Sequence, residues 1–201
     1  MTTAPSPGRP RDPELERRAL SATRLIYAEE GRKGVTFHQV ALRSGVGKPA
    51  LYRRWDSADD LLVDALSDLT LPVIADDIHD LTAELAAFAE ATMLMLLEPE
   101  GAAVLRVLTE FHQHPAHFER YMENVKVHVV TGTHAIILRA IERGDLPRAA
   151  NAEVVAASVA GGAIVQVLTA LHAGRPTEPA QIRAFCEQLA SFAVAGAKTG
   201  F

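Results

Sequence analysis

The feature that most constrains this chain is a series of helix start and stop signals spaced along its length. Thr36 to Gln39 and Ser57 to Asp60 form capping boxes, in which side chains satisfy the backbone N–H groups of a first helical turn. Stop signals follow at Gly45, at Gly144 to Pro147 and at Gly174 to Pro179. Aromatic residues make up 5% of the chain, which is few for a β-rich protein. The sequence therefore predicts an all-α fold.

Apolar residues recur at helical spacing between these signals. They predict four helices in the first third of the chain, near 12–30, 36–44, 47–55 and 57–71, and longer ones near 80–97, 100–113, 116–143, 152–173 and 178–198. One β-like run, Val127 to Val130, lies inside the helical pattern of 116–143 and is assigned to that helix.

Charge divides the chain into two parts of opposite sign. Up to Trp55 there are eleven Lys and Arg against five acidic residues, a net charge of +6, whereas the rest carries −11. A basic first part suits a polyanionic partner, and the acidic remainder does not. The charge division therefore predicts two modules, of which only the first is suited to a polyanion.

Residues 36–55 have the size and turn chemistry of a helix-turn-helix, with Ser44, Gly45 and Val46 in the turn. The apolar positions Val40, Ala41, Val46, Leu51 and Trp55 are expected to face inward, which leaves one cationic surface of Lys48, Pro49, Ala50, Tyr52, Arg53 and Arg54. Such a helix fits the major groove, which is roughly 12 Å wide. Pro49 and Ala50 permit close approach and contact with a thymine methyl, Lys48 reaches a guanine edge or a phosphate, and the last three suit phosphates.

The runs Thr36-Phe37-His38-Gln39-Val40-Ala41 and Gly45-Val46-Gly47-Lys48-Pro49-Ala50-Leu51-Tyr52-Arg53-Arg54-Trp55 resemble the DNA-binding signature of TetR-family repressors. The resemblance covers roughly residues 12–70. It implies a homodimer in which each copy has a three-helix DNA-binding head and a variable helical ligand-binding body. Together with the charge division it predicts a flexible basic arm over 1–11, a helix-turn-helix DNA-binding domain over 12–56, and a helical ligand-binding and dimerisation domain over 57–201. By position it assigns Thr36 to a helix cap beside a phosphate and His38 to the bases. It further assigns Lys48, Pro49 and Ala50 to the groove, and Tyr52 and Arg54 to the DNA backbone.

Two positions depart from the family pattern. Ala58 stands where the family usually has a lysine at the start of the fourth helix, which removes one expected phosphate contact. Gly47 stands where a small hydroxyl residue is common, which weakens the cap of the recognition helix by a few tenths of a kcal/mol.

The second part of the chain is expected to hold an unidentified small-molecule effector and to form the dimer. Candidate pocket residues are Phe88, Met95, Phe111 and Met122, although the same helical stripe equally suits a core. The candidate dimer interface uses the last two helices, through Ala157, Gly161, Ile164, Leu168, Ile182, Phe185 and Leu189.

Other classes of protein are disfavoured by the sequence. No secretory signal is visible, so a cytoplasmic protein is expected. Val154 to Gly174 holds 21 residues without charge, yet its many small residues suit helix packing in a soluble bundle more than a membrane span. The histidines between His112 and His117 lack the spacing of a compact metal site, and no cofactor is expected. No enzyme motif is present, so a small helical ligand carrier or enzyme is only the alternative to a DNA-binding regulator.

Overall fold

The computed structural model describes residues 13–69, 79–113, 118–123, 130–174 and 178–199. Within these ranges the chain is helical and contains no strand, which confirms the all-α fold. The chain divides into two compact units, Met1–Asp68 (unit 1) and Leu69–Phe201 (unit 2). The expected basic arm over 1–11 lies outside the described residues.

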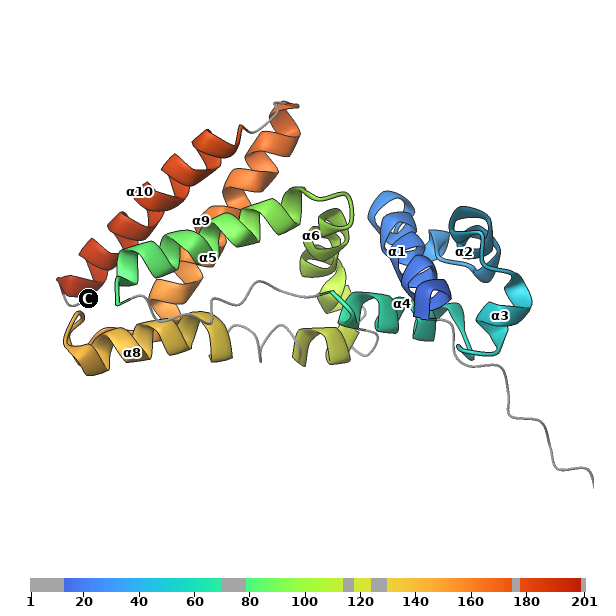
Figure 1. Ribbon diagram of the computed structural model, residues 1–201, viewed down its shortest axis with the longest axis horizontal. Coiled ribbons are helices and arrows are strands. Elements are labelled where there is room, and N and C mark those ends of the chain that lie inside the picture. Colours follow the sequence, from blue (N-terminus) through green and yellow to red (C-terminus); the bar gives the residue numbers. More distant parts are fainter. Residues whose placement is uncertain (1–12, 70–78, 114–117, 124–129, 175–177, 200–201) are drawn as a thin grey trace, which may run out of the picture. The chain divides into compact units, whose positions relative to one another are not determined.

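Unit 1 is built from α1 (Pro13–Glu30), the short 3-10 helix η1 (Arg32–Gly34), α2 (Phe37–Ser44), α3 (Lys48–Tyr52) and α4 (Ala58–Ser67) (Figure 1). α1 packs against both α2 and α4, and α2 packs against α3. The centre of this unit is filled by large apolar side chains that are at most 4% exposed: Ile26, Tyr27, Val40, Val46, Leu51, Trp55, Leu61, Leu62 and Leu66.

The boundary between the units lies one helix later than the boundary expected from the sequence, which separated 12–56 from 57–201. α4 belongs to unit 1 because polar contacts fix it there as well as apolar packing. Buried Arg24 of α1 donates to the Ala65 carbonyl oxygen at 2.9 Å and pairs with Asp68 at 3.1 Å. The indole Nε1 of Trp55 donates to Asp64 at 2.9 Å.

The turn between α2 and α3 is fixed by local hydrogen bonds. Gly45 ends α2 in the left-handed region, at φ 68°, and its N–H donates to the Ala41 carbonyl at 3.1 Å. The Ser44 hydroxyl donates to the Val40 carbonyl at 2.6 Å and accepts from the Val46 N–H at 3.1 Å. The chain therefore leaves α2 in one defined direction, with the Val46 side chain buried.

The predicted caps of α2 and α4 are confirmed. The Thr36 hydroxyl accepts from the Gln39 N–H at 3.2 Å, and the Ser57 hydroxyl accepts from the Asp60 N–H at 3.0 Å. α3 starts after Gly47, which supplies no side-chain cap, as its lack of a hydroxyl predicted. α3 is shorter than the expected 47–55, although the Trp55 N–H still donates to the Leu51 carbonyl at 3.0 Å.

Unit 2 contains α5 (Leu81–Leu97), α6 (Gly101–Glu110), the 3-10 turn η2 (Phe111–Gln113), the π-helical turn η3 (Val130–His134), α8 (Ala135–Arg143), α9 (Ala152–Ala173) and α10 (Pro179–Lys198), with residues 118–123 also helical. α5 packs against α9 and α10 and carries most of the core contacts (Figure 1). The predicted helix 116–143 has π geometry at η3, and its residues 116–117 and 124–129 lie outside the described residues.

A charged cluster ties α5 to α8 inside unit 2. Glu84 of α5 is fully buried, with Arg139 of α8 at 3.3 Å and Arg143 of α8 at 4.0 Å. A carboxylate removed from water requires such partners, because an unpaired buried charge is strongly destabilising.

The turn glycine gives a test of this geometry. An added Cβ at Gly45 meets only the Arg18 guanidinium at 3.8 Å, so a substitution there is strained by its positive φ and not by a lack of space. We expect Gly45→Ala to destabilise unit 1 by about 1–2 kcal/mol, the cost of the left-handed conformation for an L side chain. Gly45→Asn should cost less, because asparagine adopts this conformation more readily.

The fluorescence of Trp55, the only tryptophan, reports unit 1 directly during urea denaturation. Equal urea midpoints for the wild type and Gly45→Ala would show that Gly45 does not need the left-handed conformation.

Candidate nucleic-acid interface

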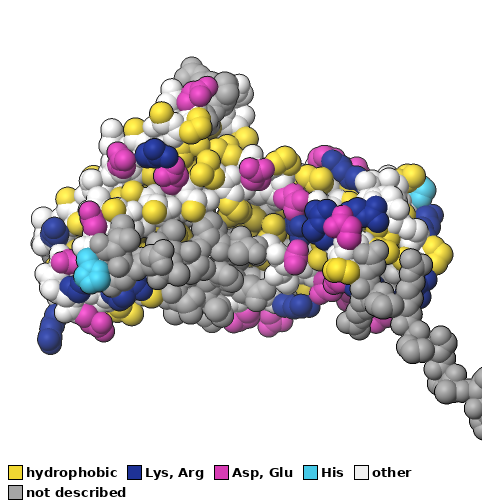
Figure 2. Space-filling model, in the orientation of Figure 1, with side chains coloured by type: hydrophobic (Ala, Val, Ile, Leu, Met, Phe, Trp, Pro, Cys, Tyr) yellow, Lys and Arg dark blue, Asp and Glu magenta, His cyan; other side chains and the backbone are white. Residues whose placement is uncertain are grey.

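The exposed face of α2 and α3 combines basic side chains with small and polar ones. From Gly31 to Trp55 the sequence carries six Lys and Arg and no Asp or Glu. Among the predicted DNA-binding residues, Thr36, His38, Lys48, Pro49, Tyr52 and Arg53 are exposed and Ala50 is half-buried. Figure 2 shows Lys, Arg and His side chains along the edge of unit 1 that carries α2 and α3. The structure thus places these seven residues on two adjacent helices and their caps.

The basic residues of this region fall into two groups. Arg32 pairs with Asp59, Arg43 with Glu29, and Arg54 with Glu16. Hydrogen bonding to Arg43 lowers the pKa of the Glu29 carboxyl, so that pair stays ionised at neutral pH.

Lys33, Lys48 and Arg53, by contrast, make no ion pair within the described part of the chain. Their charges are available to a polyanion without first breaking a contact inside the protein.

Arg54, predicted to contact the DNA backbone, makes an ion pair inside unit 1. Its side chain is only 20% exposed, and its guanidinium pairs with Glu16 of α1, which is itself partly buried. The structure therefore places Arg54 apart from the exposed cations and uses it to hold the end of α3 against α1. The sequence pattern did not reveal this pairing, because Glu16 lies 38 positions earlier in the chain.

Tyr52 lies on the exposed face with its position fixed by an aromatic contact. Its side chain is 63% exposed, and its ring meets the ring of Phe37 edge to face, with centroids 4.5 Å apart and planes at 65°. Phe37 is buried at the start of α2. The contact links the end of α3 to the start of α2 and presents Tyr52 in a restricted orientation.

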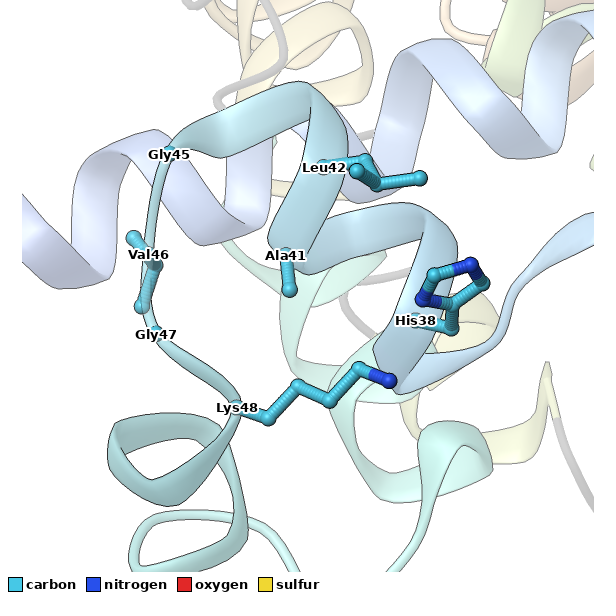
Figure 3. Close-up of a pocket in the computed structure, with 7 residues that line it drawn as sticks. All are labelled: His38, Ala41, Leu42, Gly45, Val46, Gly47 and Lys48. Carbon is cyan, nitrogen blue, oxygen red and sulfur yellow. The ribbon is translucent and has the colours of Figure 1, made fainter.

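An open pocket of about 310 Å³ lies between α2 and α3. Its lining residues are His38, Ala41, Leu42, Gly45, Val46, Gly47 and Lys48 (Figure 3). Figure 3 shows the Lys48 side chain extending from the start of α3 toward His38. The sequence analysis did not predict Leu42 as a site residue. The signal was its spacing, because it follows His38 by four residues and therefore lies on the same outer face of α2.

This arrangement suits duplex DNA. Exposed cations and hydroxyl groups contact phosphates, and small residues at the start of a helix allow close approach to base edges. α3 begins at Lys48, so the residues at its start protrude beside the pocket, as in a recognition helix that enters the major groove by its N-terminal end.

The predicted effector residues are dispersed in unit 2. Phe88 is 7% exposed and belongs to the main core, whereas Met95, Phe111 and Met122 are half-buried on α5, η2 and the 118–123 helix. Of the histidines between 112 and 117, only His112 is described, and it is exposed. No group of metal-ligating side chains occurs within the described ranges.

The predicted dimer residues separate into outward and inward positions. On α9, Ala157 and Leu168 are exposed, and Gly161 and Ile164 are half-buried. On α10, Phe185 and Leu189 are half-buried. Ile182 is only 2% exposed and packs in the core of its own chain, so its assignment to the dimer interface is corrected. Ile182 belongs to the apolar stripe of α10 that faces the core. The regular spacing of apolar residues on α10 does not distinguish core positions from interface positions, so the sequence alone could not identify Ile182 as a core residue.

α9 is also long and apolar enough to cross a membrane. Its mean hydropathy reaches 2.0 over an 18-residue window, and only 28% of that window is buried. Its outward apolar side chains are Val154, Val165, Leu168 and Leu171, each at least 48% exposed. Length and composition alone do not distinguish a membrane helix from a helix that packs on another protein.

Comparison with known proteins finds the same family for both units. Residues 19–65 match the family described as bacterial regulatory proteins of the tetR family, and residues 75–189 match the tetracyclin repressor-like C-terminal domain. The HTH-type transcriptional regulator AqdR of Rhodococcus erythropolis is 28% identical over 172 residues, which cover 83% of this chain and 80% of that protein.

Two solved structures share the fold at low identity. The fatty acid degradation regulator FadR from Bacillus halodurans has a TM-score of 0.72 at 12% identity, covering 94% of this chain and 98% of that chain. FadR from Bacillus subtilis, solved in complex with stearoyl-CoA, has a TM-score of 0.67 at 13% identity, covering 90% and 98%. The family matches extend over both units, and they agree with the helix-turn-helix geometry of α2 and α3. The chain belongs to the TetR family of DNA-binding transcriptional regulators.

Proposed function

We propose that this regulator is a repressor that holds operator DNA through α2 and α3 and releases it when a small molecule binds unit 2. The observation that carries the proposal is the basic face of α2 and α3, whose sequence from Gly31 to Trp55 holds no acidic residue, with Lys48 and Arg53 outside any ion pair of the described chain. In this proposal Lys48, Pro49 and Ala50 read the groove. Thr36, Tyr52 and Arg53 contact phosphates, His38 lies at the base edges, and Arg54 braces α3 through Glu16.

The proposed effector is apolar or amphipathic and binds within unit 2. A buried polar group supports this assignment: the Tyr121 side chain is 2% exposed, and its hydroxyl has no hydrogen-bond partner among the described residues. Burial raises the pKa of Tyr121 to about 12, so the hydroxyl remains a neutral donor at physiological pH. Leaving such a group unsatisfied costs about 1–3 kcal/mol, which an effector with an acceptor atom would recover. Phe111 and Met122 are proposed as apolar wall residues.

α4 is the proposed transmitter between effector and DNA. Its last turn is held to α1 by Arg24, and Trp55 at the end of the recognition segment donates to Asp64 in its middle. A displacement of α4 would therefore act on both α1 and Trp55. The effector releases DNA only if it prefers a conformation in which two heads no longer match successive major grooves, roughly 34–36 Å apart.

The proposed assembly is a homodimer formed by α9 and α10. An added Cβ at Gly161 meets no atom within 4 Å, so the space over this residue is open to a second copy. Phe192 of α10 is 79% exposed, and the outward apolar side chains of α9 are each at least 48% exposed. Covering these side chains removes apolar surface from water, which is the usual source of dimer stability. We place this dimer in the cytoplasm, where the family's DNA targets lie.

DNA binding is tested first. The purified protein is first used to capture genomic DNA fragments, and the fragments that it retains serve as duplexes for binding measurements. Affinity for these duplexes should fall steeply with salt concentration, because each neutralised phosphate contributes about −0.9 to the slope of log K against log salt. Lys48→Ala should in addition relax sequence preference by about 1–3 kcal/mol, the worth of a good base contact. Arg53→Ala should weaken binding to all duplexes by the same factor. Lys198→Ala, at the far end of α10, is the matched control and should leave binding unchanged.

Affinity that stays flat between low and physiological salt would contradict DNA binding by this face. It would favour a ligand carrier or an enzyme. Fluorescence anisotropy with several labelled duplexes, repeated over a salt series, measures the salt dependence of the affinity and the sequence preference.

The dimer is tested by two adjacent glycines. Gly161→Leu places its side chain in open space and should favour monomers by overpacking the interface, at about 1–3 kcal/mol. Gly162→Leu serves as the contrast, because a Cβ there already lies 2.7 Å from Leu189 Cδ1 of the same chain. It should lower the thermal stability of the protomer itself. Multi-angle light scattering in the absence of detergent measures the mass.

A wild-type monomer would count against the dimer, as would a Gly161→Leu variant that remains fully dimeric. Solubility of the wild type only in detergent would favour a membrane role for α9.

The switch is tested through Tyr121. Tyr121→Phe removes only the hydroxyl, so ligand-free operator affinity should stay unchanged and the melting temperature should not fall. The affinity for an effector with an acceptor atom should drop about tenfold, the worth of one hydrogen bond. A thermal-shift screen of amphipathic compounds supplies the effector. The account fails if every tight binder leaves operator affinity untouched, because release requires several kcal/mol of differential affinity.

A further inference from the structure

Leu42 is an exposed leucine on the outer face of α2. Its side chain is 68% exposed, whereas Phe37 and Val40 of the same helix point into the core. Exposed His38 precedes it by four residues, so both side chains lie on one face of the helix. Figure 3 shows Leu42 and His38 directed to the same side of α2. Core packing therefore does not account for a leucine here.

The surroundings of Leu42 are cationic and concave. It lines the open pocket together with Lys48, and no acidic residue occurs between Gly31 and Trp55. Single exposed leucines are common on protein surfaces and need no explanation. A leucine on the wall of a basic pocket differs, because any anionic partner that engages Lys48 also comes close to Leu42. Such a partner must offer an apolar group beside its negative charges.

Duplex DNA satisfies both requirements in the major groove. Its phosphates lie along the groove edges, and the C5-methyl of thymine is the apolar group displayed on the groove floor. A second copy of this face fits poorly, because the exposed charges of Lys48 and Arg53 would meet the same charges on the other copy and repel them. The charge of the pocket thus favours DNA over self-association.

We propose that Leu42 contacts a thymine methyl in the operator and adds an apolar base contact on α2, one helical turn beyond His38. The inference rests on the proposed DNA-binding role of the α2 and α3 face. Leu42 would then set a preference for thymine at one position of each half-site, outside the bases read from Lys48, Pro49 and Ala50. The contact is apolar, so it would depend little on salt, unlike the contacts of Lys48 and Arg53.

The test deletes the methyl group from the DNA. Each thymine of a retained duplex is replaced in turn by deoxyuridine, which keeps the base pair and loses only the C5-methyl. The wild type should lose about fourfold in affinity at one position per half-site, the effect of withdrawing one buried carbon from apolar contact. Leu42→Ala should bind the unmodified duplex more weakly and should no longer respond to deoxyuridine at that position.

Two controls separate the outcomes. Leu138→Ala removes a leucine that is 52% exposed on α8 of unit 2, and it should keep the wild-type response. Ala50→Gly tests the other apolar candidate and should also keep the response at the Leu42 position. Trp55 fluorescence in urea verifies that Leu42→Ala keeps the fold of unit 1.

Equal deoxyuridine losses in wild type and Leu42→Ala would overturn this inference, as would a wild type indifferent to every substitution. In both cases salt-dependent duplex binding persists, so the proposed function stands. Absence of any salt-dependent binding to unmodified duplex is a different result, which overturns the proposed function together with the inference.

Discussion

The reversal of the chain at Ser44, Gly45 and Val46 is the constraint on which the candidate interface depends. Gly45 takes a positive φ that other residues adopt at a cost, and the Ser44 hydroxyl bonds to both sides of the turn. Burial of Val46 and Leu51 then fixes α3 against the rest of unit 1. The direction of this one turn determines which side chains of α2 and α3 share a face. Lys48 reaches the side of His38 only because of it.

The basic residues of unit 1 differ in whether they form ion pairs inside the protein. Arg24, Arg32 and Arg54 contact acids or carbonyls on other segments and join α1, α3 and α4 into one body. Lys48 and Arg53 are exposed and make no ion pair with any residue that the structure describes. Net charge does not distinguish these groups, because a paired arginine and an exposed one count equally. A polyanion approaching this face thus meets charges whose binding does not compete with the contacts that hold the fold.

Local signals explain why much of the fold was predictable from the sequence. The cap at Thr36, the left-handed Gly45 and the inward Val46 each depend on residues within a few positions, where propensity and pattern decide. Contacts between distant segments were not predictable in this way. Arg54 pairs with Glu16, Arg24 holds the end of α4 in unit 1, and Ile182 packs in its own core, and each depends on how helices meet. Leu42 was overlooked because an apolar residue at an outward position is usually incidental.

The central claim is that duplex DNA is bound on the face formed by α2 and α3. Amide hydrogen exchange of the full chain, with and without a retained duplex, tests it most directly because it locates the contact along the sequence. The account predicts slower exchange over residues 36–54 on adding DNA, with the larger part of the effect lost in high salt. Protection confined to unit 2, with exchange over 36–54 unchanged at saturating DNA, would contradict it.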